Sequence, residues 1–146
     1  MKNSVLNQFE KSLFEAPNMS TDNKYLKAKV DAGAEYVVTQ MFYDNKAYFR
    51  FVKDCRASGI DVPIIPGLKF LSTEAHLRVI PKNFFVDIPE DLSSQVIGQP
   101  KEVIQCIGLD WALKQVQELV DAKVPCVHFY IMSSAKPAAK VVSQFN

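Results

Sequence analysis

The sequence lacks the short motifs that mark common nucleotide-binding and nucleophilic sites. Its 146 residues contain no G-x-G-x-x-G, no P-loop and no G-x-S-x-G. No stretch approaches the roughly 20 apolar residues of a membrane-spanning helix. The net charge is only +1, from 17 basic and 16 acidic residues, so no basic field favours nucleic acid or an anionic membrane as a partner.

Cysteine is also scarce. Cys55, Cys106 and Cys126 are odd in number and form no C-x-x-C pair, which favours reduced thiols over a disulfide framework. The first ten residues contain one lysine and no apolar segment, so they do not have the pattern of a secretory signal peptide. These absences predict a cytoplasmic protein.

Short apolar segments alternate with helical patterns along the chain. Strands are predicted at residues 35–42, 62–67 and 125–132, and helices at residues 20–31, 45–58, 73–80, 87–100 (broken) and 101–122, with a further helix near the end. This alternation predicts an α/β fold with a parallel sheet, and the first strand reads as covered on both faces. The chain is predicted to form one domain over residues 1–146, with residues 1–18 as a poorly structured lead-in.

Prolines and caps set the expected boundaries. Asp44 is predicted to cap the second helix, and Pro63 and Pro66 are expected at the start and end of the second strand. Pro81 is expected to end a helix capped by Ser72 or Thr73. The long helix is expected to bury a face formed by Cys106, Leu109, Leu113, Val116 and Val120.

Ligands of parallel α/β folds bind at the carboxyl edge of the sheet, so the residues that end each strand are the candidates for a site. Gln40 ends the first strand, where a carboxamide is costly unless it is paired. Its donors and acceptor suit the edge of a flat heterocycle; the alternative is that it fastens a neighbouring loop. His76, in the helix after the second strand, is placed near the same edge.

Two further patterns have a plain and a functional interpretation. Asp22 and Lys29 share a face of the first helix, either as a solvated surface or as a pair that hydrogen-bonds the ribityl or phosphate groups of a cofactor. His128 and Cys126 point to one face of the third strand, but a core histidine is favoured over a metal ligand, and no metal site is predicted. No nucleophile–base pair is found.

Several blocks of the sequence resemble the later part of methylenetetrahydrofolate reductase. They are residues 14–18 (FEAPN), 27–34 (KAKVDAGA), 38–44 (VTQMFYD), 64–68 (IIPGL), 87–91 (DIPED) and 127–130 (VHFY). The blocks occur in the family's order and spacing, and the resemblance covers about residues 9–132. Agreement over several ordered blocks is far more specific than one short motif.

The resemblance implies a (β/α)8 barrel with FAD, in which NAD(P)H reduces the flavin and a hydride then converts 5,10-methylenetetrahydrofolate into 5-methyltetrahydrofolate. A complete barrel needs roughly 250 residues, so the chain is expected to be a partial TIM barrel, its C-terminal half with the last three strands. By resemblance, Gln40 contacts the pterin of the folate substrate, and His76 stands where the family has a substrate-binding glutamine. Asp22 and Lys29 match residues that contact FAD.

The chain also departs from the family pattern. Leu13 stands where the family has a histidine that helps to bind FAD, and Ser134 where an arginine is common. The family's two acidic catalytic residues belong to the first half of the barrel, so no catalytic residue is assigned to this chain, which is expected to be inactive alone. Its expected partner is the missing barrel half or a second copy. The alternative is a non-catalytic α/β association module from a truncated or split gene, because open sheet edges favour association.

Overall fold

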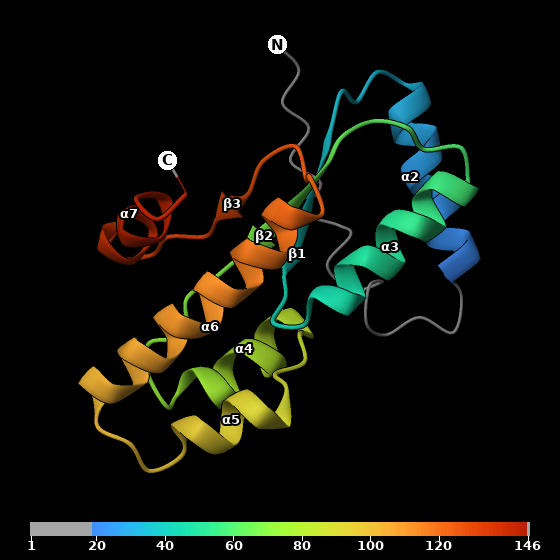
Figure 1. The fold of residues 1–146 in the computed structure, drawn as a ribbon. Helices are drawn as coiled ribbons and strands as arrows, with labels where there is room; N and C mark the ends of the chain where they lie inside the picture. Colours follow the sequence, from blue (N-terminus) through green and yellow to red (C-terminus); the bar gives the residue numbers. More distant parts are fainter. Residues whose placement is uncertain (1–18, 146) are drawn as a thin grey trace.

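Three parallel strands form the centre of the structure, a computed structural model that describes residues 19–145 (Figure 1). The strands β1 (Val37–Met41), β2 (Ile64–Leu68) and β3 (His128–Phe129) lie in the order β1-β2-β3. The register pairs Val37 with Ile64 and Gly67 with His128. The α/β class and the parallel sheet are therefore confirmed, whereas the predicted lead-in at residues 1–18 lies outside the described residues.

Six helices surround this sheet in the part of the chain that the structure describes. They are α2 (Met19–Asp31), α3 (Asn45–Ala57), α4 (His76–Phe84), α5 (Glu90–Val96), α6 (Lys101–Asp121) and α7 (Lys136–Val142). In Figure 1, α2, α3 and α6 run opposite to the strands, so these helices begin at the end of the molecule where β1 and β2 finish. None of the described helices has the length and apolar character needed to cross a membrane.

The main core lies between one face of the sheet and the helices. Val37 and Ile64 pack there against Leu26 of α2 and Leu119 of α6. Side chains alternate between the faces of a strand, and the alternating residues Val38 and Ile65 are only half-buried. Thr39, Gln40 and Met41, which follow one another along β1, are nonetheless all buried, so most of the first strand is covered on both faces, as expected.

Pro66 lies in the middle of β2, the central strand, and does not end it as predicted. Proline has no backbone N–H to give to a neighbouring strand. The pairing of β1 with β2 shifts register between Val38 and Met41, and the Thr39 hydroxyl accepts the Gly67 N–H at 3.0 Å. This local irregularity and the side-chain hydrogen bond let the strand continue through the proline.

Helix α4 begins at His76 and includes Pro81, so the predicted cap and the predicted end are both wrong. Neither Ser72 nor Thr73 caps the helix, because Ala75 occupies the N-cap position and no side chain makes the capping hydrogen bond. The backbone N–H of Ser72 donates instead to His76 Nδ1 at 3.2 Å. An internal proline removes one helical hydrogen bond. The neighbouring Ile80, 1% exposed, holds this segment in the core and helps to offset that loss.

Helix α6 spans nearly the predicted residues but is rotated about its axis relative to the prediction. Cys106 and Val120 of the predicted face are exposed, whereas Gly108 is buried. A Cβ atom on Gly108 would lie 1.9 Å from the carbonyl oxygen of Leu71. The helix therefore packs on the chain after β2 through its small residues, which hydrophobic periodicity alone does not reveal.

The third strand is much shorter than predicted. Only His128–Phe129 pairs with β2, and the Tyr130 N–H adds one hydrogen bond to Leu68 O at 2.8 Å. His128 is exposed, so its interpretation as a core histidine is wrong. The apolar run from Cys126 onward reads as a buried strand, yet only one edge of β3 is paired among the described residues.

Candidate functional site

Gln40 ends its strand with a buried carboxamide that is only half satisfied. Its side chain is 6% exposed, and Oε1 accepts the Met41 N–H at 2.9 Å. The amide nitrogen Nε2 has no hydrogen-bond partner among the described residues. A buried donor without an acceptor costs roughly 1–3 kcal/mol. The arrangement leaves an N–H group ready for an acceptor atom that comes from outside the described residues.

The face of the sheet opposite the main core carries Lys69 at its carboxyl edge. Leu68 of β2 is buried in the helix-covered core, so its neighbours Gly67 and Lys69 belong to the opposite face. Met41 pairs with Gly67, which brings the end of β1 beside this segment. Gln40 thus ends one strand beside the residues that end the next.

A tyrosine crosses the edge between the strands. The Tyr130 hydroxyl donates to Thr39 O at 2.8 Å. A Cβ atom on Gly67 would lie 2.6 Å from the Tyr130 ring and 2.5 Å from Thr39 O. Glycine at this position is therefore what lets the ring approach β2 and fasten β3 to β1. Sequence reasoning did not single out Tyr130, although its place directly after a strand is the signal that points to it.

His76 contributes a donor near the same edge. Its Nδ1 atom accepts the Ser72 N–H at 3.2 Å, so the proton of the neutral ring is on Nε2. Burial lowers the pKa of this half-buried ring, and the positive charge of Lys69 lowers it further. The same influence indicates that Lys69 and His76 lie close together. At neutral pH the imidazole is a neutral hydrogen-bond donor.

Asp22 and Lys29 lie in the first and last turns of α2. Seven residues of helix separate them by roughly 10 Å along the axis. Asp22 lies at the end of α2 where β1 finishes, and Lys29 lies at the end where β1 begins (Figure 1). A carboxylate suits a hydroxyl donor and an ammonium suits a phosphate, but only an extended ligand can contact both side chains.

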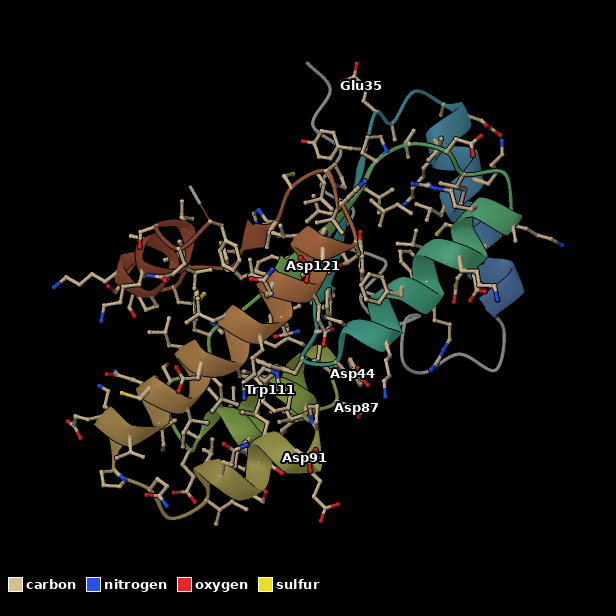
Figure 2. The ribbon with its side chains drawn as sticks, viewed as in Figure 1. Glu35, Asp44, Asp87, Asp91, Trp111 and Asp121 are labelled. Carbon is tan, nitrogen blue, oxygen red and sulfur yellow. The ribbon has the colours of Figure 1, made fainter. Side chains whose placement is uncertain are left out.

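A polar network holds the turn that follows Gln40, and sequence reasoning missed it. Trp111 on α6 donates from Nε1 to Tyr43 O at 2.9 Å, and Figure 2 shows Trp111 directed toward the turn that contains Asp44. Gln115 donates from Nε2 to Phe42 O at 3.2 Å and to Asn45 Oδ1 at 3.1 Å. The turn is therefore fixed by side chains some 70 residues away.

The hydroxyl of Tyr43 lies in the same region and is also buried without a partner among the described residues. Burial raises its pKa, so the phenol stays protonated. Tyr43 packs with Met41, Leu71 and Ile80 in a second core beneath the carboxyl edge. Its surroundings are apolar, so this hydroxyl belongs to the support of the site.

Comparison with known proteins gives one consistent result. A family model described as methylenetetrahydrofolate reductase matches residues 5–146. "Probable methylenetetrahydrofolate reductase (NADPH)" of Caenorhabditis elegans is 34% identical over 122 residues, covering 82% of this chain and 18% of that protein. "Methylenetetrahydrofolate reductase 2" of Saccharomyces cerevisiae is 34% identical over 137 residues, covering 90% of this chain and 23% of that protein.

A bacterial relative agrees with the eukaryotic ones. "5,10-methylenetetrahydrofolate reductase" of Salmonella typhimurium is 35% identical over 124 residues, covering 84% of this chain and 42% of that protein. The chain spans less than a quarter of the length of the two eukaryotic relatives and under half of the bacterial one.

Proposed function

Because this chain belongs to the methylenetetrahydrofolate reductase family, we propose that it forms the folate-binding part of a flavin-dependent reductase. The reaction would convert 5,10-methylenetetrahydrofolate into 5-methyltetrahydrofolate with NADH or NADPH as the reductant, as the names of the relatives suggest. The matched length supports a part of that enzyme, so the groups that transfer protons are assigned to residues outside this sequence. Three free cysteines are compatible with work in the cytoplasm.

The proposed architecture is a segment of a (β/α)8 barrel, formed by residues 1–146 as one partial domain. Three parallel strands in sequence order, with α3 between β1 and β2 and with helices on one face, are what such a segment would provide. The carboxyl edge with Gln40 and Lys69 would then lie at the end of the barrel where such enzymes bind their substrates. A second copy or the remaining strands of the barrel would complete the sheet.

The unpaired amide of Gln40 is the observation that supports folate binding most directly. A pterin is a flat heterocycle with acceptor and donor atoms along one edge, and a carboxamide matches such an edge. Oxygen Oε1 is held by Met41 N–H, which fixes the amide plane and leaves Nε2–H as the donor to the ligand. His76 offers a second neutral donor at the same edge.

Asp22 and Lys29 are proposed as contacts of FAD. When bound, the flavin would accept a hydride from the nicotinamide nucleotide and deliver it to the folate. The two side chains fit this group in kind, because a ribityl chain presents hydroxyl donors to a carboxylate and a diphosphate presents oxygens to an ammonium. Their positions at opposite ends of α2 match a cofactor bound in an extended form.

Substitution of Gln40 tests the proposal. Gln40→Leu removes both amide groups, and Gln40→Glu keeps an acceptor for Met41 N–H while removing the Nε2 donor. Both should weaken folate binding by roughly 1–3 kcal/mol, about 5- to 150-fold. Isothermal titration with folate measures the loss. Gln117→Leu, at an exposed glutamine of α6, is the matched control and should bind as the unchanged chain does. Equal affinity in all variants would refute the assignment.

A non-catalytic association module is the second candidate function, favoured by the unpaired edges of β1 and β3 among the described strands. The visible spectrum after addition of FAD separates the two candidates. A shifted flavin spectrum that NADH bleaches supports a reductase. Absence of flavin uptake and of folate binding, together with stable dimers in size-exclusion chromatography, supports the module.

A further inference from the structure

Lys69 directly follows β2 and points away from the main core. Its two neighbours define this direction: Leu68 is 2% exposed in the core, and Phe70 stacks on Phe129 with ring centroids 5.3 Å apart beside the same core. Alternation along extended backbone then places Lys69 on the opposite face with Gly67, whose partner Met41 directly follows Gln40 in the neighbouring strand. Lys69 is thus a cationic group at the carboxyl edge of the sheet where Gln40, the proposed pterin contact, also lies.

The ammonium group of Lys69 has no anionic partner among the described residues. The salt bridge found among the described residues joins Lys27 to Asp31 within helix α2 and does not involve Lys69. Lys69 is half-buried, and burial lowers its pKa. Its positive charge lowers the pKa of His76, whose neutral ring is a hydrogen-bond donor at Nε2. A partly desolvated cation without an anionic partner in the chain is stabilised by an anion supplied by a ligand.

We propose that Lys69 is a specificity-determining residue that binds a carboxylate of the glutamate tail of folate. This inference rests on the proposed function and adds the recognition of the tail to the recognition of the ring. The pterin edge is uncharged and is matched by the Gln40 carboxamide, whereas the glutamate carboxylates are the full negative charges of an unphosphorylated folate. The Nε2–H group of His76 is a second donor available to the same carboxylate.

Two fragments of folate separate the ring from the tail. 6-Methylpterin contains the ring and no carboxylate, and p-aminobenzoylglutamate contains the tail and no pterin. Lys69→Met should weaken binding of folate and of p-aminobenzoylglutamate by roughly tenfold, the usual effect of losing a charged hydrogen bond, and leave 6-methylpterin unchanged. Lys69→Arg should keep most of the affinity. Lys82→Met makes the same charge change at an exposed site of α4 and should alter none of the three.

The outcomes distinguish the two proposals. If Lys69→Met leaves p-aminobenzoylglutamate and folate unaffected, or weakens 6-methylpterin equally, tail recognition by Lys69 is refuted while folate binding stands. If the unchanged chain binds neither folate nor either fragment, the proposed function is refuted and the inference with it. Far-ultraviolet circular dichroism of each variant confirms that the fold is intact, and higher salt should weaken only the tail-containing ligands, because salt screens ion pairs.

Discussion

The surroundings of His76 in the candidate site make the free energy of unfolding depend on pH. Its ring accepts the Ser72 N–H at Nδ1 and lies near the Lys69 ammonium, and both features favour the neutral form. Burial and Lys69 place the folded-state pKa below the ordinary value of 6.5. Between these two pKa values the unfolded chain binds more protons than the folded chain, so stability there rises with pH.

We therefore predict that the free energy of unfolding decreases as the pH falls from 6.5 through the lower pKa of His76 in the folded chain. The decrease arises because protonation of His76 favours the unfolded chain. Above 6.5 the contribution of His76 to stability is fully present. His76→Gln keeps an acceptor for Ser72 N–H but cannot titrate, so its stability should depend less on pH in this window. Urea unfolding of both proteins over a pH series measures the difference. Parallel stability curves for the two proteins would contradict the prediction.

Sequence reasoning at the residue scale could place Gln40 but could not describe its state. The end of an apolar strand marks where a polar side chain stands at the sheet edge, and Gln40 is buried there as expected. That Oε1 is occupied by Met41 N–H and Nε2 is unpaired depends on local backbone geometry. Lys69 directly follows β2, yet its significance depends on the absence of an anionic partner in space, which the sequence does not show.

Elements with a local signal were predicted well, and those governed by distant contacts were not. The Asp44 side chain accepts Lys46 N–H at 2.9 Å and caps α3, as the sequence indicates. The rotation of α6 depends instead on the contact of Gly108 with Leu71. The short extent of β3 depends on which edges of the sheet are paired. The hydrophobic pattern within one segment of the sequence carries no information on the packing of Gly108 against Leu71 or on the pairing of β3.

Gly108 provides a test at the scale of the element, because propensity and packing predict opposite effects. Alanine in an exposed helix is more stable than glycine by about 1 kcal/mol. At this site the added Cβ would lie 1.9 Å from the Leu71 carbonyl oxygen and 2.9 Å from the carbonyl carbon, both backbone atoms that cannot move aside cheaply.

We predict that Gly108→Ala lowers the free energy of unfolding by about 1–3 kcal/mol, the usual cost of overpacking. Chemical denaturation measures it. Gln105→Ala, at an exposed position of the same helix, should change stability by less than about 0.5 kcal/mol. A gain of stability in Gly108→Ala would mean that α6 does not approach the chain after β2 as closely as described.

For the whole molecule, the open sheet is the feature that sets how the chain behaves in solution. Among the described residues, β1 and β3 each pair on one side only, and Val38 and Ile65 are half-buried on the face opposite the main core. Unpaired backbone groups and apolar surface of this kind favour association with another chain. If the sheet is a barrel segment, the strands that complete it should compete for the same edges.

We therefore predict that the chain alone forms dimers or larger species, and that a polypeptide carrying the remainder of the Salmonella typhimurium relative shifts it toward a one-to-one complex. Light scattering after size-exclusion chromatography measures both masses.

Val38→Lys places a charge on the edge strand and should weaken both associations, because an inward lysine on such a strand opposes pairing. Val103→Lys, on the exposed side of α6, adds the same charge away from the sheet and should weaken neither. A monomer in both conditions would show that these edges are not association surfaces. Equal loss in the two lysine variants would assign association to net charge rather than to the sheet.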